Sequence, residues 1–182
     1  MSNITIADLF KIGASKGKEK LQDATNKLFR KLPANFPVNF EDVVEINRPI
    51  LGRHVDIVAY RAVLLSIVKY LGFNALSKLY HAGVDFGKSL GVKSLDEMIE
   101  CFEYLGMGIP KLVSKDPIKI HIYECAFCSG LPNVGKSVCY FERGIIKGCL
   151  ESILNKEVEV VESKCYACGY DYCEFIAHPV RK

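Results

Sequence analysis

The sequence predicts an α+β domain whose N-terminal helices pack on an antiparallel or mixed β-sheet. Apolar residues recur at helical spacing up to about residue 105. In the last third of the chain they alternate with polar residues, which is typical of half-buried strands. Because helices and strands occupy separate parts of the chain, helices stacked on one sheet are favoured over alternating βα units.

The composition limits the chain to one folded domain. Its 182 residues suit a single domain, and 49% hydrophobic with 25% charged residues exclude both a disordered chain and a membrane protein. The net charge of +3 is too small to predict a nucleic-acid or membrane partner. The basic residues concentrated in residues 1–35 scatter around a helix instead of forming a stripe, so they predict a solvated surface.

The chain divides near residue 40 and shows no targeting signal. Pro33 and Pro37 interrupt any helix, which separates an N-terminal helical arm (1–40) from the main domain (41–182). The first residues lack the basic-then-apolar pattern of a secretory signal, and no stretch approaches the roughly 18 apolar residues of a membrane helix. We therefore expect a cytoplasmic protein whose cysteines stay reduced.

Four helices are expected before the first strand, and they cover residues 5–30, 56–71, 74–90 and 95–105. Gly72, Gly91 and Gly106 follow the last three, as glycine commonly does at a helix end. Ser94, with Glu97 three residues later, forms a capping box that begins the fourth helix.

Three strands and one further helix follow. Alternation predicts strands at 118–122, at 157–160 and near 173–177, and the helix is expected at about 140–154. On that helix Gly144 and Gly148 leave room for close approach of another element. The expected order is therefore helices first, and then strand, helix, strand, strand.

Residues 130–137 fit the phosphate-loop pattern G-x-x-x-x-G-K-[ST]. Such a loop would use Lys136 on phosphates and Ser137 on magnesium. Only 45 residues follow Ser137, and their single aspartate, Asp171, stands among cysteines instead of ending a buried strand. We therefore reject nucleotide hydrolysis.

The eight cysteines are the strongest chemical signal in the sequence. Cys101 and Cys149 fall on apolar helical faces, where a free cysteine behaves as a small buried hydrophobe. The other six lie within 49 residues, and this concentration predicts a bound zinc: Cys125, Cys128, Cys139, Cys165, Cys168 and Cys173. Six candidates exceed four positions, and the two C-x-x-C pairs, 125/128 and 165/168, would by themselves supply four thiolates.

Three segments resemble the 4-vinyl reductase domain family. Residues 139–148 hold a cysteine and a glycine-spaced helix, residues 157–165 a valine-rich strand ending in E-x-x-C, and residues 169–175 a short hairpin close to G-D-x-x-C-x-F. Here Tyr170 intervenes between the glycine and the aspartate of that hairpin, and the aspartate stands only two residues before the cysteine. Residues 48–52 and 60–61 resemble the domain's opening, so the resemblance covers about residues 45–178.

The resemblance implies a fold shared with ligand-sensing domains of aromatic-responsive transcription activators and, more distantly, with Golgi transport-particle subunits. In those sensors three cysteines and a glutamate hold a zinc. Carried over residue by residue, the implied ligands are Cys139, Glu162, Cys165 and Cys173. A site closed by four protein ligands would be structural and would clamp the C-terminal strand hairpin to the helix. Cys125, Cys128 and Cys168 are departures from the family pattern, and they leave the fourth ligand open.

We therefore expect a zinc-stabilised domain that binds an apolar or aromatic small molecule. His81 and Phe127 are the candidate ligand-binding residues, although core packing is the simpler interpretation of each. Related domains imply a homodimer, and these 182 residues contain no recognisable output module, so a signal would pass through self-association or a partner. The alternatives are an enzyme reducing a vinyl group in tetrapyrrole metabolism, for which no cofactor motif is found, and an interaction scaffold.

Overall fold

The computed structural model describes residues 48–50, 55–72 and 74–180. The elements are α4 (Ile57–Leu71), α5 (Asn74–Ser89), α6 (Leu95–Tyr104), β1 (Ile109–Lys115), β2 (Ile118–Tyr123), α7 (Tyr140–Leu154), β3 (Val158–Lys164), a 3-10 turn at Tyr166–Cys168, and β4 (Cys173–Pro179). The expected helix at 5–30, the proline boundary at 33–37 and the arm at 1–40 lie outside the described residues.

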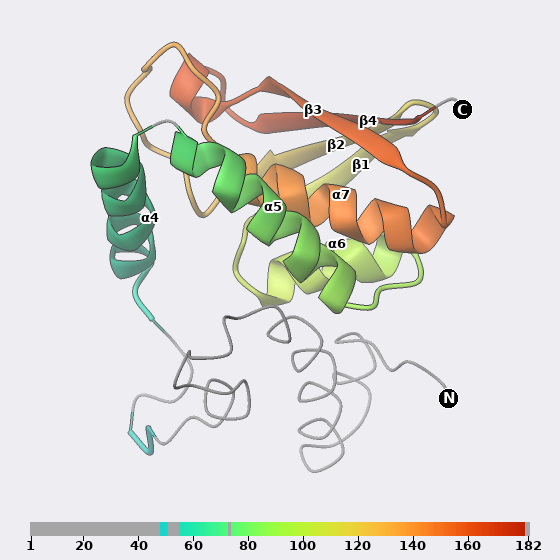
Figure 1. Cartoon of the computed structure of the whole chain (residues 1–182), viewed down its shortest axis with the longest axis horizontal. Helices are drawn as coiled ribbons and strands as arrows, with labels where there is room; N and C mark the ends of the chain where they lie inside the picture. Colours follow the sequence, from blue (N-terminus) through green and yellow to red (C-terminus); the bar gives the residue numbers. More distant parts are fainter. Residues whose placement is uncertain (1–47, 51–54, 73, 181–182) are drawn as a thin grey trace.

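One four-stranded sheet, in the order β1-β2-β4-β3, organises the domain. Every neighbouring pair is antiparallel, which confirms the α+β class and decides between the two sheet types left open by the sequence. Helices α6 and α7 pack on the sheet, α5 runs along α7, and α4 stands to one side (Figure 1). Among the described residues no helix is both long and apolar enough to cross a bilayer.

Helix α6 begins, and helices α4 and α5 end, at the capping residues that the sequence predicted. Ser94 Oγ accepts a hydrogen bond from the Glu97 amide at 3.1 Å and begins α6. The Glu97 carboxylate accepts from the amide of Lys93 at 2.9 Å, one residue earlier than a capping box requires. Gly72 and Gly91 follow α4 and α5 with φ of 69° and 64°, which glycine adopts without strain.

Strand β1 corrects the expected element order. It pairs with β2 through a tight turn at Asp116-Pro117, so the second half of the chain runs strand, strand, helix, strand, strand. Pro110 argues against a strand in the sequence because proline cannot donate to a ladder. It is accommodated here because β1 lies at the edge of the sheet, where one side needs no ladder bonds.

Four glycines allow α5 and α7 to pack with their backbones in contact. Gly83 and Gly87 on α5 face Gly144 and Gly148 on α7. A Cβ on Gly144 would overlap the Tyr80 carbonyl oxygen, and one on any of the other three would likewise overlap a backbone carbonyl of the facing helix. The close approach predicted for Gly144 and Gly148 is confirmed, and it fixes α7 against α5.

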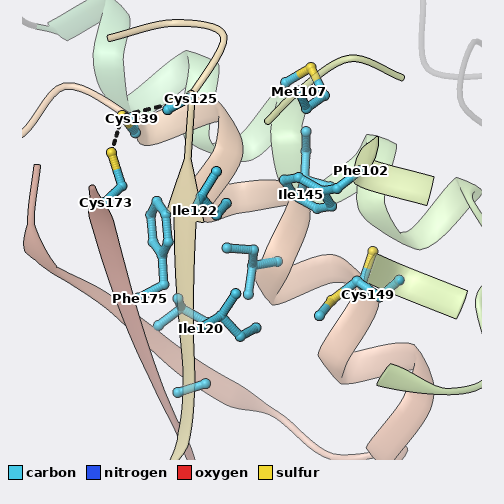
Figure 2. Close-up of a cluster of buried hydrophobic side chains, with 14 of the residues drawn as sticks. Phe102, Met107, Ile120, Ile122, Cys125, Cys139, Ile145, Cys149, Cys173 and Phe175 are labelled. Carbon is cyan, nitrogen blue, oxygen red and sulfur yellow. Dashed lines mark hydrogen bonds between the residues drawn. The ribbon is translucent and has the colours of Figure 1, made fainter. Parts of the chain in front are cut away.

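The core lies between the helices and the sheet. Inward-facing residues of β2 and β4, among them Ile120, Ile122 and Phe175, form one buried cluster with Ile145 of α7 (Figure 2). Cys101 and Cys149 are fully buried in this core, as predicted. The remaining buried cysteines gather at the other end of it, at the amino end of α7.

Candidate metal centre

Five cysteine thiols and one carboxylate converge where α7 begins. Cys125 and Cys128 come from the loop after β2, Cys139 is the N-cap residue of α7, Glu162 is in β3, Cys165 follows β3, and Cys173 opens β4. All five cysteines have no exposed surface. Figure 2 shows Cys125, Cys139 and Cys173 together, with Cys149 well separated from them on α7.

The sheet register brings these residues to one place. Cys173 pairs with Ile122 across β4 and β2, so it lies beside the loop that carries Cys125. Glu162 follows Val158 and Val160 at alternate positions of β3, which directs its side chain to the same face as those buried valines. A register shift after Glu162 then turns the chain so that Cys165 enters the cluster.

Cys139 is the centre of the cluster. Its Sγ lies 3.1 Å from that of Cys128, 3.6 Å from Cys173, 3.7 Å from Cys125 and 3.8 Å from Cys165. The Cys139 amide donates to Glu162 Oε2 at 3.2 Å, while Glu162 Oε1 is buried without a hydrogen-bond partner. A buried carboxylate oxygen with no donor is costly unless a cation or proton satisfies it.

The donor set fits a tetrahedral metal ion. Two overlapping groups each bring four ligand atoms within 4.8 Å of one another: Cys125, Cys128, Cys139 and Cys173, and Cys139, Glu162, Cys165 and Cys173. Ligands about 2.3 Å from a tetrahedral ion stand about 3.8 Å apart, close to most of the sulfur separations here. Thiolates favour zinc and other soft or borderline metals, so the cluster could hold such an ion.

Burial opposes the ionisation of Cys139 and Glu162 when no cation is present. It is the largest cause of the raised pKa of Cys139, and the neighbouring thiols add to it. Burial and the adjacent Cys165 raise the pKa of Glu162 to about 9. A bound divalent cation reverses this preference because it stabilises the ionised ligands directly.

All four residues that the family resemblance implies as ligands lie in this cluster. Cys125 and Cys128 join them, whereas Cys168 belongs to neither four-ligand group and has its Sγ 3.9 Å from Ser137 Oγ. The double C-x-x-C arrangement is therefore not assembled. Which residues bind metal stays a prediction.

Glu142 was not expected as a site residue, yet it is the most unusual side chain near the cluster. It lies one turn after Cys139, is fully buried, and has no hydrogen-bond partner for either carboxylate oxygen. Burial first, and then the Cys125 thiol, raise its pKa well above the ordinary value. The nearby Tyr60 hydroxyl is also buried without a partner, and burial and Glu142 raise its pKa. The sequence signal that could have identified Glu142 is its position on an otherwise apolar face of the predicted helix.

Helix α4 is tied to the cysteine loop through Arg61. Its Nε donates to the Ala126 carbonyl at 2.6 Å, and its Nη2 donates to Ser129 Oγ at 2.8 Å. This places Tyr60, the preceding residue, beside the segment that holds Cys125 and Cys128.

The two predicted ligand-binding residues occupy different environments. Phe127 is buried in the loop between Cys125 and Cys128, beside the cluster. His81 is exposed, so its interpretation as a core histidine is wrong: the helical phase of α5 turns Gly83 and Gly87 inward and His81 outward. It lines an open groove of about 610 Å³ with charged residues of α5 and of the end of α7, including Lys88, Lys147 and Glu151.

Two amides at the tip of the phosphate-loop match are already bonded within the protein. The amides of Val134 and Gly135 both donate to the Ala167 carbonyl, at 2.8 and 3.2 Å. The Gly135 amide also lies 2.9 Å from Asn133 Oδ1. Because a phosphate loop needs these donors for its ligand, the geometry supports the rejection of this motif.

Comparisons with known proteins agree with the sequence resemblance. The family model of the 4-vinyl reductase domain matches residues 118–179, from β2 through β4. The uncharacterized protein MJ1642 of Methanocaldococcus jannaschii is 36% identical over 126 residues, 69% of this chain and 78% of that protein.

Two crystal structures share the fold. A vinyl-4-reductase family protein from Methanocaldococcus jannaschii matches with a TM-score of 0.58 and 23% identity, over 72% of this chain and 85% of that one. The phenol-responsive sensory domain of the transcription activator PoxR, determined with phenol, matches with a TM-score of 0.60 and 16% identity, over 87% and 90%. With its family segment, its curated relative and its fold in agreement, this chain belongs to the 4-vinyl reductase domain family.

Proposed function

We propose that this chain is a zinc-stabilised domain that binds an apolar or aromatic molecule carrying one hydrogen-bonding group. The observation that carries the proposal is the pair of buried, unpartnered groups beside the thiol cluster, the Glu142 carboxyl and the Tyr60 hydroxyl. Native interiors rarely leave such groups unpaired, and a ligand's hydroxyl would satisfy both.

The zinc in this proposal is structural. Cys139, Glu162, Cys165 and Cys173 would hold it, and the free Oε1 of Glu162 supplies the oxygen ligand. Four protein ligands leave no open position for a substrate, so the ion would connect α7 to β3 and β4 and take no part in catalysis.

The ligand would bind next to this ion. Phe127 offers an aromatic surface in the cysteine loop, and Glu142, with its raised pKa, is a neutral carboxyl able to donate as well as accept. A phenolic hydroxyl could accept from one group and donate to the other. The fold likeness to the phenol-responsive domain of PoxR supports this class of ligand.

Self-association is part of the proposal. Helix α4 exposes an apolar strip formed mainly by Val63, Tyr70 and Leu71. A second copy of the chain would cover it, as expected for an apolar surface of this kind. Light scattering of the full chain and of Val63→Glu tests this, and a monomeric wild-type protein would contradict it.

Thermal denaturation with phenol, and with benzene as the matched compound lacking the hydroxyl, tests ligand binding. A ligand specific for the folded state stabilises by about 2.7 kcal/mol at a hundredfold excess over Kd, so phenol should raise the melting temperature more than benzene does. Tyr60→Phe and Glu142→Gln should each reduce the advantage of phenol. Loss of the response in His81→Ala instead would place the ligand in the open groove, and no response to either compound would contradict the proposal for simple phenols.

A further inference from the structure

Cys139 has more neighbouring ligands than one tetrahedral ion can explain. In a single tetrahedron each ligand has three others beside it. Cys139 has five, because four other thiols lie within 3.8 Å of its sulfur and a Glu162 carboxylate oxygen lies within 4.8 Å of it. A thiolate on an edge shared by two tetrahedra has five such neighbours: the other shared ligand and two terminal ligands of each ion.

The two four-ligand groups have this arrangement. They share Cys139 and Cys173, whose sulfurs lie 3.6 Å apart. Cys125 and Cys128 complete one group, and Glu162 and Cys165 complete the other. The six ligands thus divide into two bridging and four terminal positions.

We propose that the cluster binds two divalent metal ions bridged by the Cys139 and Cys173 thiolates. One ion takes Cys125 and Cys128 as terminal ligands, and the other takes Glu162 and Cys165. This inference rests on the metal centre of the proposed function and adds a second ion to it.

Burial and charge favour two ions over one. Five thiolates and a carboxylate carry six negative charges, which two divalent cations reduce to two. A single ion would leave either Cys125 and Cys128, or Glu162 and Cys165, buried beside it without metal. An ion at the Cys125 and Cys128 end alone would leave Glu162 Oε1, which is buried without a hydrogen-bond partner among the described residues, unsatisfied, and that is costly.

Metal titration of the full-length chain, reduced and free of oxygen, tests the inference. Native mass spectrometry with zinc should show two ions per chain. With cobalt(II), the electron paramagnetic resonance signal should rise with the first equivalent and fall with the second, because shared thiolates couple the two spins.

Variants locate each ion without depending on activity. Cys128→Ser and Glu162→Gln remove terminal ligands of different ions, so each should reduce the count from two to one and remove the coupled signal. Cys168→Ser is the matched control and should keep two ions, since its sulfur lies outside both groups.

The outcomes separate this inference from the proposed function. One ion at saturation in the wild type, or two ions whose cobalt signals simply add, would overturn the bridged pair and leave a structural metal in place. Iron with inorganic sulfide would also overturn it, because sulfide would occupy the bridging positions. No bound metal under any condition would contradict both.

Discussion

Helix α7 carries a buried and a half-buried glutamate with opposite surroundings. Glu151, near its carboxyl end, is paired with Lys88 at 2.7 Å and with Lys147 at 2.8 Å. Burial acts to raise its pKa, but hydrogen bonds from Lys147 and Lys88 outweigh that effect and lower it. Glu142, near the amino end, has neither an ion-pair partner nor a hydrogen-bond donor among the described residues, and its pKa is raised.

The difference separates an end of the helix whose carboxylate is paired within the protein from the end at which we propose the binding site. At Glu151 the protein supplies every partner, so nothing further is needed for that end to be stable. At the other end, the described part of the chain offers no hydrogen-bond partner to the Glu142 carboxylate, the Tyr60 hydroxyl or Glu162 Oε1. Groups of this kind mark binding sites, and here they gather at one end of one helix.

Loss of the central thiolate should have the largest effect on this contrast. Cys139→Ser removes a ligand shared by both four-ligand groups, so we expect loss of metal and a fall of several kcal/mol in the free energy of unfolding. Calorimetry with metal analysis measures both. Cys168→Ser should change little, and full metal retention by Cys139→Ser would contradict the assignment.

Disturbing the glycine contact between α5 and α7 should lower the free energy of unfolding without distinguishing the two ends of α7. Gly144→Ala would place a methyl group against the Tyr80 carbonyl, and we expect a loss of about 3 kcal/mol from overpacking. In an unhindered helix the same change gains about 1 kcal/mol, so the sign of the effect is diagnostic. Chemical denaturation measures it. A stabilised variant would show that α5 and α7 are not held this closely.

The two glutamates should respond to pH with opposite signs. Because the folded-state pKa of Glu142 is raised, the folded state binds more protons, and stability falls as pH rises above the ordinary value of 4.5. Glu142→Gln should remove that fall. The pKa of Glu151 is lowered, so its contribution is present above 4.5 and is lost as pH falls through the folded-state value.

Glu151→Gln should therefore cost about 1 kcal/mol at neutral pH, while Glu142→Gln should be neutral or stabilising there. Denaturation midpoints measured from about pH 3.5 to about pH 8, a range that extends below the ordinary glutamate pKa of 4.5, test the pair. Equal losses in both variants would remove the distinction between the two ends.

The smallest effect is expected in the loop before α7. Lys136→Ala should change stability by less than about 0.5 kcal/mol and should alter no nucleotide response, since the nearby amides are bonded to Ala167. Equilibrium dialysis with ATP and magnesium is sufficient. Saturable binding that this variant abolishes would restore the phosphate-loop interpretation.

Local signals in the sequence were enough for most elements. Helix boundaries followed Gly72, Gly91 and the Ser94 cap, because such ends are determined by a few neighbouring residues. Strand β1 was not predicted because Pro110 argues against a strand. An edge strand tolerates proline, but whether a strand lies at the edge depends on the whole sheet and cannot be seen in the local sequence.

The sequence predicted the cysteines of the candidate site but not the buried glutamate beside them. Clustered cysteines are conspicuous, so the converging thiols were all among the six candidates. Cys168 could not be separated from the others, since a C-x-x-C spacing does not reveal which sulfur turns away. Glu142 was missed because acidic residues are mostly exposed, and its place on an otherwise apolar face of α7 was the one sequence signal of its burial.

The pairing of β2 with β4 has a consequence for how the chain folds. Ile122 and Cys173 are opposite each other in the sheet although a long stretch of chain, including α7, lies between them. Contacts between such distant residues form slowly because the intervening loop must close first. An ion captured by Cys125, Cys128 and Cys173 before the strands meet would close that loop in advance. Such an ion would then speed the approach to the native state as well as add to its stability.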